Sequence, residues 1–189
     1  MKNKHRIVTV AIGIIFGLLL VSCHSNELSK RNNEAGLNGS FETAVAGYPV
    51  NWAFFPNPES DNIFKISVDT TKAQDGNQSL KLTTNQKSRV VGFRCSRVPV
   101  EPGKTYNISF TLQNDGCGLK VRRIVQDYSG TDNRRSEIIF NTSSVISHWK
   151  TFEEKLIVSE GERNVVFIFL IDGPGTLWID DFLVEEVKM

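Results

Sequence analysis

The sequence predicts an all-β fold, and three observations support this class. From residue 37 onward, short apolar segments recur between turn residues such as Gly, Pro, Asn and Asp. Some of them alternate, as in Tyr106, Ile108, Phe110 and Leu112 against the polar residues between them. No stretch after residue 36 has a convincing helical period. Short strands joined by tight turns favour a β-sandwich or jelly roll over a parallel sheet.

The first segment of the chain has the pattern of a targeting signal. Lys2, Lys4 and Arg6 precede an unbroken apolar run from Ile7 to Val21, which is too short to span a bilayer comfortably. The run ends in Leu-Val-Ser-Cys, which resembles a bacterial lipobox whose acylated Cys23 becomes the new N-terminus. An ordinary secretory peptide with a chance Cys is the alternative.

The boundaries follow from this pattern. We expect a lipoprotein signal peptide over residues 1–22, a flexible tether over 23–36 and a single β-sandwich over 37–189. Loss of residues 1–22 removes three cations and changes the formal net charge from +1 to −2, so a nucleic-acid partner is not expected. The membrane is expected as a partner through the lipid, since several acyl chains anchor a protein stably.

The expected strands follow in order along the domain. They are Ile63–Val68, Ser79–Thr84, Arg89–Val98, Thr105–Gln113, Leu119–Tyr128, Glu137–Asn141, Thr151–Val158, Asn164–Ile171 and Leu177–Val184. Alternating segments predict an antiparallel sheet with one side packed. The run Val165–Ile171 does not alternate, which predicts a central strand that is covered on both faces.

Two cysteines remain after processing, Cys95 and Cys117. A disulfide is one possibility in an oxidising compartment, and one buried and one loop thiol is the other. The three His residues are scattered and no Cys-x-x-Cys spacing occurs, so zinc is not expected.

A series of short motifs resembles the landmarks of CenC-like carbohydrate-binding modules, which accompany cellulases and xylanases. The motifs are Asn38–Glu42, Pro49–Trp52, Ala73–Leu82, Val100–Tyr106, Trp149 and Leu177–Phe182, and their order and spacing fit from about Leu37 to Val187. The resemblance implies a jelly-roll β-sandwich of the galactose-binding-like group, with a structural calcium ion near one edge. Its ligands would be Glu42, Asp75 with a carbonyl near Gln78, and Asp180.

The adjacent carboxylates Asp180 and Asp181 also indicate that a carboxylate at the expected calcium site needs a binding partner. Neighbouring residues on a strand point to opposite faces, so one carboxylate is driven inward, where an unpaired charge is costly. Calcium takes six to eight oxygen ligands and would neutralise this charge. The alternative is that backbone donors alone bind Asp180.

The candidate sugar-binding residues are polar side chains that alternate with core positions. They are Arg94, Gln113, Arg122, Gln126 and Tyr128, with Arg97 and Arg123 as further candidates. Arginine and amide groups suit glycan hydroxyls and carboxylates, and a solvated sheet face is the alternative. Trp52, Trp149 and Trp178 are expected to pack rather than to form sugar platforms. The basic pairs Arg122–Arg123 and Arg134–Arg135 could favour an acidic polysaccharide or serve only as a solubilising surface.

An enzyme is not expected from these residues. Glu153–Glu154 and Glu185–Glu186 are sequence neighbours that would point to opposite faces of a strand, whereas glycosidases need two carboxylates across a cleft. No Ser-His-Asp order occurs, and His148 beside Trp149 is a lone His that is expected to be a loop residue rather than a catalytic base. The expected function is therefore a non-catalytic, lipid-anchored module that captures polysaccharide or oligosaccharide. The alternative is a structural or protein-interaction lipoprotein. The expected location is the bacterial outer membrane, periplasmic or surface-exposed, with envelope proteins as possible partners.

Overall fold

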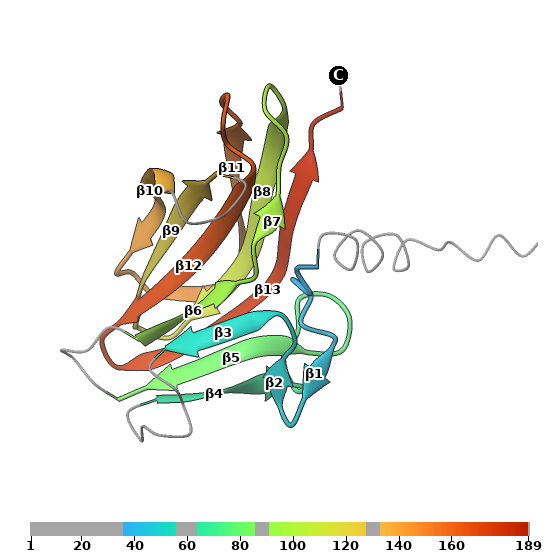
Figure 1. Cartoon of the computed structure of the whole chain (residues 1–189). Helices are drawn as coiled ribbons and strands as arrows, with labels where there is room; N and C mark the ends of the chain where they lie inside the picture. Colours follow the sequence, from blue (N-terminus) through green and yellow to red (C-terminus); the bar gives the residue numbers. More distant parts are fainter. Residues whose placement is uncertain (1–35, 56–63, 86–90, 128–132, 189) are drawn as a thin grey trace, which may run out of the picture.

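Two antiparallel sheets make up the fold. The computed structural model describes residues 36–55, 64–85, 91–127 and 133–188. Within these ranges every regular element is a strand, and the two larger sheets face each other as a sandwich (Figure 1). No helix that could cross a membrane occurs in the described part of the chain. The prediction of an all-β jelly-roll sandwich is confirmed.

The six-stranded sheet has β12 at its centre. Its order is β10 (Asn133–Thr142), β9 (Gly118–Gln126), β12 (Asn164–Asp172), β6 (Val91–Cys95) and β3 (Trp52–Phe55), and β7 (Val98–Pro99) also pairs with β12. The five-stranded sheet has the order β11 (Ile146–Ile157), β8 (Thr105–Asn114), β13 (Gly175–Glu186), β5 (Ser79–Thr84) and β4 (Phe64–Asp69). A small hairpin, β1 (Ala44–Val45) and β2 (Tyr48–Pro49), precedes them.

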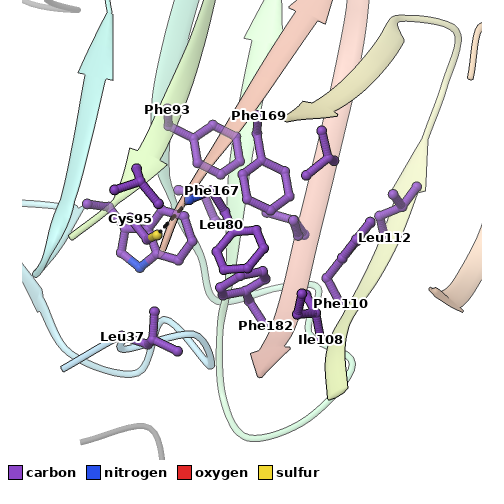
Figure 2. Close-up of a cluster of buried hydrophobic side chains, with 14 of the residues drawn as sticks. Leu37, Leu80, Phe93, Cys95, Ile108, Phe110, Leu112, Phe167, Phe169 and Phe182 are labelled. Atoms are coloured by element: carbon purple, nitrogen blue, oxygen red, sulfur yellow. Dashed lines mark hydrogen bonds between the residues drawn. The ribbon is translucent and has the colours of Figure 1, made fainter. Parts of the chain in front are cut away.

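Aromatic rings fill the space between the sheets. Phe93 and Phe169 are register partners whose rings stack with centroids 4.8 Å apart, and Phe182 on β13 packs edge-on against Phe169 (Figure 2). Trp52 packs against the same cluster, and its indole N–H donates to Asn38 O at 3.2 Å. Side chains of alternate residues from both sheets interlock in this way, as expected for a sandwich core.

Most expected strands are present, with shifts of a few residues at their ends. The stretch predicted as one strand over Arg89–Val98 is divided, because Ser96 and Arg97 interrupt the pairing between β6 and β7. The strands β1, β2 and β3 were not predicted, because they are short and lack a clear period. β3 exists through its pairing with β6, which sequence alone does not reveal.

The central position of β12 is confirmed, but its prediction as a fully covered strand is wrong. Val165, Phe167 and Phe169 point into the core and are buried. On the opposite side Val166 is buried, whereas Ile168 and Leu170 are only half-buried. The strand therefore lacks polar alternation because it presents apolar side chains on the outer face of its sheet.

Both cysteines are free thiols. Cys95 is buried on β6 and Cys117 lies in the loop between β8 and β9, as in the alternative of one buried and one loop thiol, except that the loop thiol is buried as well. Burial raises the pKa of Cys95 to about 12 and that of Cys117 to about 11. The two groups are therefore neutral and unreactive at physiological pH.

The three tryptophans differ in their surroundings. Trp52 is in the core, as predicted. Trp149 on β11 is half-buried and does not belong to the core. Trp178 on β13 is also half-buried, and its indole N–H donates to Asp69 Oδ2 at 3.0 Å while Lys72 Nζ lies 3.6 Å from the ring centroid. The rings of Trp149 and Trp178 therefore lie near the surface of the five-stranded sheet.

Candidate functional site

The outer face of the six-stranded sheet carries the candidate site. Residues that are register partners on neighbouring strands point to the same face. One such set, here called the central row, crosses the sheet from β10 to β3. It consists of Ile138, Arg122, Ile168, Arg94 and Ala53. All five are exposed or half-buried, so this row faces away from the core.

A second row lies next to the central row on the same face. It consists of Asn141, Lys120, Leu170, Gly92 and Phe55. A Cβ on Gly92 would lie 2.8 Å from Phe55 Cζ, so the glycine leaves room for the ring to rest on β6. Together with Ile168 and Leu170, the Phe55 ring gives the face an apolar centre with polar side chains around it.

Two shallow depressions flank this centre. One of about 180 Å³ is lined by Asn51, Trp52, Ala53, Arg94, Cys95 and Ser96. The other, of about 140 Å³, is lined by Gly118, Leu119, Lys120, Asn141, Thr142, Ser143, Leu170 and Asp172. The first lies over β3 and β6 and the second over β9, β10 and β12, so an extended ligand laid across the strands would contact both.

The structure brings together some of the predicted sugar-binding residues and separates others. Arg94 and Arg122 share the central row, one on each side of Ile168. Gln126 lies on the same strand and face as Arg122, but four residues further along, roughly 13 Å away.

The remaining two predicted residues are not part of this face. Gln113 lies on β8 in the five-stranded sheet, where its side chain donates to Ser147 O and its register partner is Trp178. Tyr128 lies outside the described residues. Phe55 was missed by sequence reasoning, although the aromatic run from Trp52 to Phe55 was a signal that could have revealed it.

The arginine pairs do not form one basic patch. Arg123 points inward, donates to Lys155 O at 2.9 Å and pairs with Glu137. Arg135 binds both carboxylate oxygens of buried Glu162, at 2.6 and 2.9 Å. Burial alone would raise the pKa of Glu162, but the hydrogen bonds from Arg135 and Ser159 lower it overall. These two arginines therefore tie strands together rather than face a ligand.

The predicted calcium ligands come from three segments that converge at one edge. Glu42 Oε1 accepts hydrogen bonds from the backbone N–H groups of Asn77 and Gln78 at 2.9 and 3.1 Å. The Gln78 side chain donates to Phe41 O at 2.7 Å. Gly76 has a φ of 65°, and a Cβ there would lie 2.5 Å from Glu42 Oε1, so the turn needs glycine.

Asp180 is fully buried beneath the same turn. Its Oδ2 accepts from the N–H groups of Gln74 and Asp75 at 2.8 and 3.2 Å, and its Oδ1 accepts from Asp181 N at 2.9 Å. Burial raises its pKa from 3.8 to about 7, although these amide bonds act in the opposite direction. Burial and the nearby Asp75 carboxylate also raise the pKa of Asp181. In the structure, backbone N–H groups therefore bind the Asp180 carboxylate, as in the alternative to a calcium ion.

The donor set at this edge fits a hard cation in its chemistry. Carboxylate, carbonyl and amide oxygens are the groups that calcium prefers, and no ion pair from a described cationic side chain compensates buried Asp180. Within the described ranges, however, no three His, Cys, Asp or Glu side chains are close enough to hold a metal. A calcium ion here would therefore need main-chain or amide oxygens, such as those of Phe41 and Gln78, beside the carboxylates.

Comparisons with known proteins agree with this architecture. A family model described as "Carbohydrate binding domain" matches residues 33–175. The xylan-binding domain CBM22-1 of Paenibacillus barcinonensis Xyn10C is 18% identical, with a TM-score of 0.56 over 80% of this chain and 93% of that domain. The C-terminal family 22 module of Clostridium thermocellum Xyn10B is 16% identical, with a TM-score of 0.51 over 80% of this chain and 94% of that one.

A larger protein is also similar in fold. The enzymatically active domain of tailspike protein 4 from bacteriophage CBA120 is 15% identical, with a TM-score of 0.64 over 79% of this chain. This chain spans only 21% of that domain's length. No curated protein sequence matches the chain.

Proposed function

The chain belongs to the carbohydrate binding domain family, and from this premise we propose that it is a non-catalytic, lipid-anchored module that captures polysaccharide at the bacterial cell envelope. The family match spans every strand of the six-stranded sheet. The observation that supports capture most directly is the outer face of that sheet, where Phe55, Ile168 and Leu170 form an apolar centre between polar side chains.

This arrangement suits the chemistry of sugar rings. The apolar side of a pyranose packs against aromatic and aliphatic side chains, while arginine and amide groups bind its hydroxyls. Two of the similar structures are described as a xylan-binding domain and a family 22 carbohydrate-binding module, which supports an extended polysaccharide as ligand.

Replacing Phe55 with Ala tests the proposed face. We expect polysaccharide affinity to fall about tenfold or more, because a buried phenyl ring contributes about 1.5–3 kcal/mol. Binding is measured by affinity electrophoresis and isothermal titration against xylan, β-glucan and galactan, with the full-length protein in detergent. Ile157→Ala is the matched control, because Ile157 is 67% exposed on β11 in the other sheet.

Two results would count against the proposal. Equal loss of affinity in both variants would place the ligand elsewhere. Failure of the folded parent protein to bind any neutral or acidic glycan would instead favour a structural or protein-interaction lipoprotein.

The anchor rests on the N-terminal segment, which lies outside the described residues. We expect Cys23→Ser to move the protein from the detergent phase to the aqueous phase in a detergent partition, because acyl chains would no longer be attached. Ser22→Ala is the control, because it changes the residue directly before the expected cleavage point and retains the Cys23 thiol. Retention of Cys23→Ser in the detergent phase would contradict acylation at this residue.

Calcium is also part of the proposal, as a structural ion bound by Glu42, Asp75, Gln78 and Asp180. The convergence of the 74–78 turn with Glu42 and Asp180 supports it, since these segments are distant in sequence. The ion would neutralise Asp180 and join the N-terminal segment to β13. It has no catalytic role in the proposed function.

A further inference from the structure

We infer that the outer face of the six-stranded sheet selects anionic polysaccharides, with Arg94 and Arg122 binding carboxylates of uronate residues on either side of Ile168. This inference rests on the proposed function, because it concerns the same face. It adds the ligand class, which neither the family nor the similar structures specify for this chain.

The two arginines are held at a fixed spacing by the sheet. Both are register partners of Ile168, Arg122 on β9 and Arg94 on β6. Their Cα atoms are therefore two strand separations apart, about 9.6 Å. Both are exposed and point to the outer face, so their guanidinium groups can reach two acidic sugars of one extended chain.

Neither arginine is engaged within the described part of the protein. Arg123 and Arg135 bind carboxylates and carbonyls, whereas Arg94 and Arg122 have no hydrogen bond or ion pair with another described residue. A guanidinium group presents paired N–H donors that match a carboxylate in a bidentate arrangement. A neutral hydroxyl group would accept from only one of these paired N–H donors at a time.

The charges around the central row favour an anion. Lys120 is exposed on the same face, two residues from Arg122 on β9. Among the described outer positions of these strands, the acidic residue is Asp172, level with Gly118. It lines the second depression together with Lys120, but it is four residues along β12, roughly 13 Å, from Ile168 between the two arginines. Arg94, Arg122 and Lys120 thus outnumber Asp172 on this face of a chain that is expected to carry a net charge of −2 after processing.

The apolar centre between the arginines gives the sugar ring its contact. Ile168 separates Arg94 from Arg122, and Leu170 and Phe55 lie in the next row. A polymer laid across the strands would place ring faces on these side chains and its carboxylates over the guanidinium groups. Charge and apolar contact therefore act on the same ligand.

The test compares each acidic polymer with its own neutral form. Full-length protein in detergent is titrated with polygalacturonate, alginate and glucuronoxylan, and with the same polymers after reduction of their carboxylates to alcohols. We expect at least one uronate polymer to bind about tenfold more tightly than its reduced form. This preference should weaken as salt is raised from 50 to 500 mM, roughly the range over which screening becomes strong.

Variants identify the residues responsible. Arg94→Gln and Arg122→Gln should each reduce affinity for the uronate polymer about tenfold and leave affinity for the reduced polymer nearly unchanged. Lys65→Gln, an exposed cation on β4 in the other sheet, is the matched control and should change neither. Melting curves confirm that each variant is folded.

The outcomes separate the two proposals. Binding of neutral polysaccharides with no preference for any uronate polymer over its reduced form overturns the inference and leaves the proposed function intact. A uronate preference that survives in both arginine variants also overturns it. Absence of binding to every polymer removes the proposed function and this inference together.

Discussion

Replacing Phe169 with Ala is expected to lower the free energy of unfolding by about 3–5 kcal/mol. The ring of Phe169 lies at the centre of the core on β12, with centroids 4.8 Å from Phe93, 5.6 Å from Phe182 and 5.7 Å from Phe110. Its removal leaves a cavity between the sheets that stacked rings cannot close without moving strands. Urea unfolding followed by tryptophan fluorescence measures the effect, since Trp52 is 6.0 Å from the ring.

Phe169→Leu serves as the control for this prediction. Leucine keeps most of the apolar volume, so the free energy of unfolding should fall by clearly less in this variant, about 1–2 kcal/mol. A loss below about 1 kcal/mol for Phe169→Ala would mean that the aromatic cluster does not stabilise the sandwich as a unit.

The second large effect is a pH dependence that originates at Asp180. With divalent cations removed by chelator, the free energy of unfolding should fall as pH rises from about 4 to 7. The folded-state pKa of about 7 lies above the ordinary 3.8, so in this window the folded state holds a proton that the unfolded state has released. Below pH 4 both states are protonated, and above 7 both are ionised. The total loss is up to about 4 kcal/mol, at about 1.4 kcal/mol for each pKa unit.

Calcium should reverse this loss in the parent protein. A cation that binds only the folded state at a hundred times its Kd adds about 2.7 kcal/mol, which raises the melting temperature by roughly 5–10 °C. Asp180→Asn should remove most of the pH dependence and the calcium effect together. Asp172→Asn, an exposed carboxylate on β12, is the control.

Two results would count against these expectations. An unchanged pH slope in Asp180→Asn would assign the titration to another group, of which Asp181 is the first to examine because its pKa is also raised. A melting temperature that does not respond to chelator or calcium would remove the metal and leave backbone donors as the only partners of Asp180.

The fold could be predicted from sequence because its strands carry their own periodicity. In β8, Ile108, Phe110 and Leu112 are buried, as the alternation indicated, although Thr111 between them is buried too and shares a hydrogen bond with Thr151. Trp52 could be placed in the core from its size and position. The short strand β3 could not be predicted, because its existence depends on hydrogen bonds to β6 rather than on a local pattern.

The candidate face could be predicted only in part, because register and sheet membership are long-range properties. Arg94 and Gln113 have the same local pattern, yet they lie on the outer faces of opposite sheets. Arg122 and Arg123 must point to opposite sides of β9, and alternation with the buried residues Leu119, Val121 and Val125 identifies Arg123 as the inward one. The pairing of Arg122 with Ile168 and Arg94 across the sheet could not be predicted, because it depends on the register of three strands.

The N-terminal segment of the domain is held by residues from later in the chain. Gly39 O accepts a hydrogen bond from Phe182 N at 3.0 Å, and Phe41 O accepts one from Gln78 Nε2 at 2.7 Å. A mechanical pull on the proposed tether, residues 23–36, would therefore enter the five-stranded sheet through β13 and the turn before β5. It would enter the six-stranded sheet as well, because Asn38 O accepts the indole N–H of Trp52 on β3. Both sheets would thus share the load while the candidate face holds a polysaccharide.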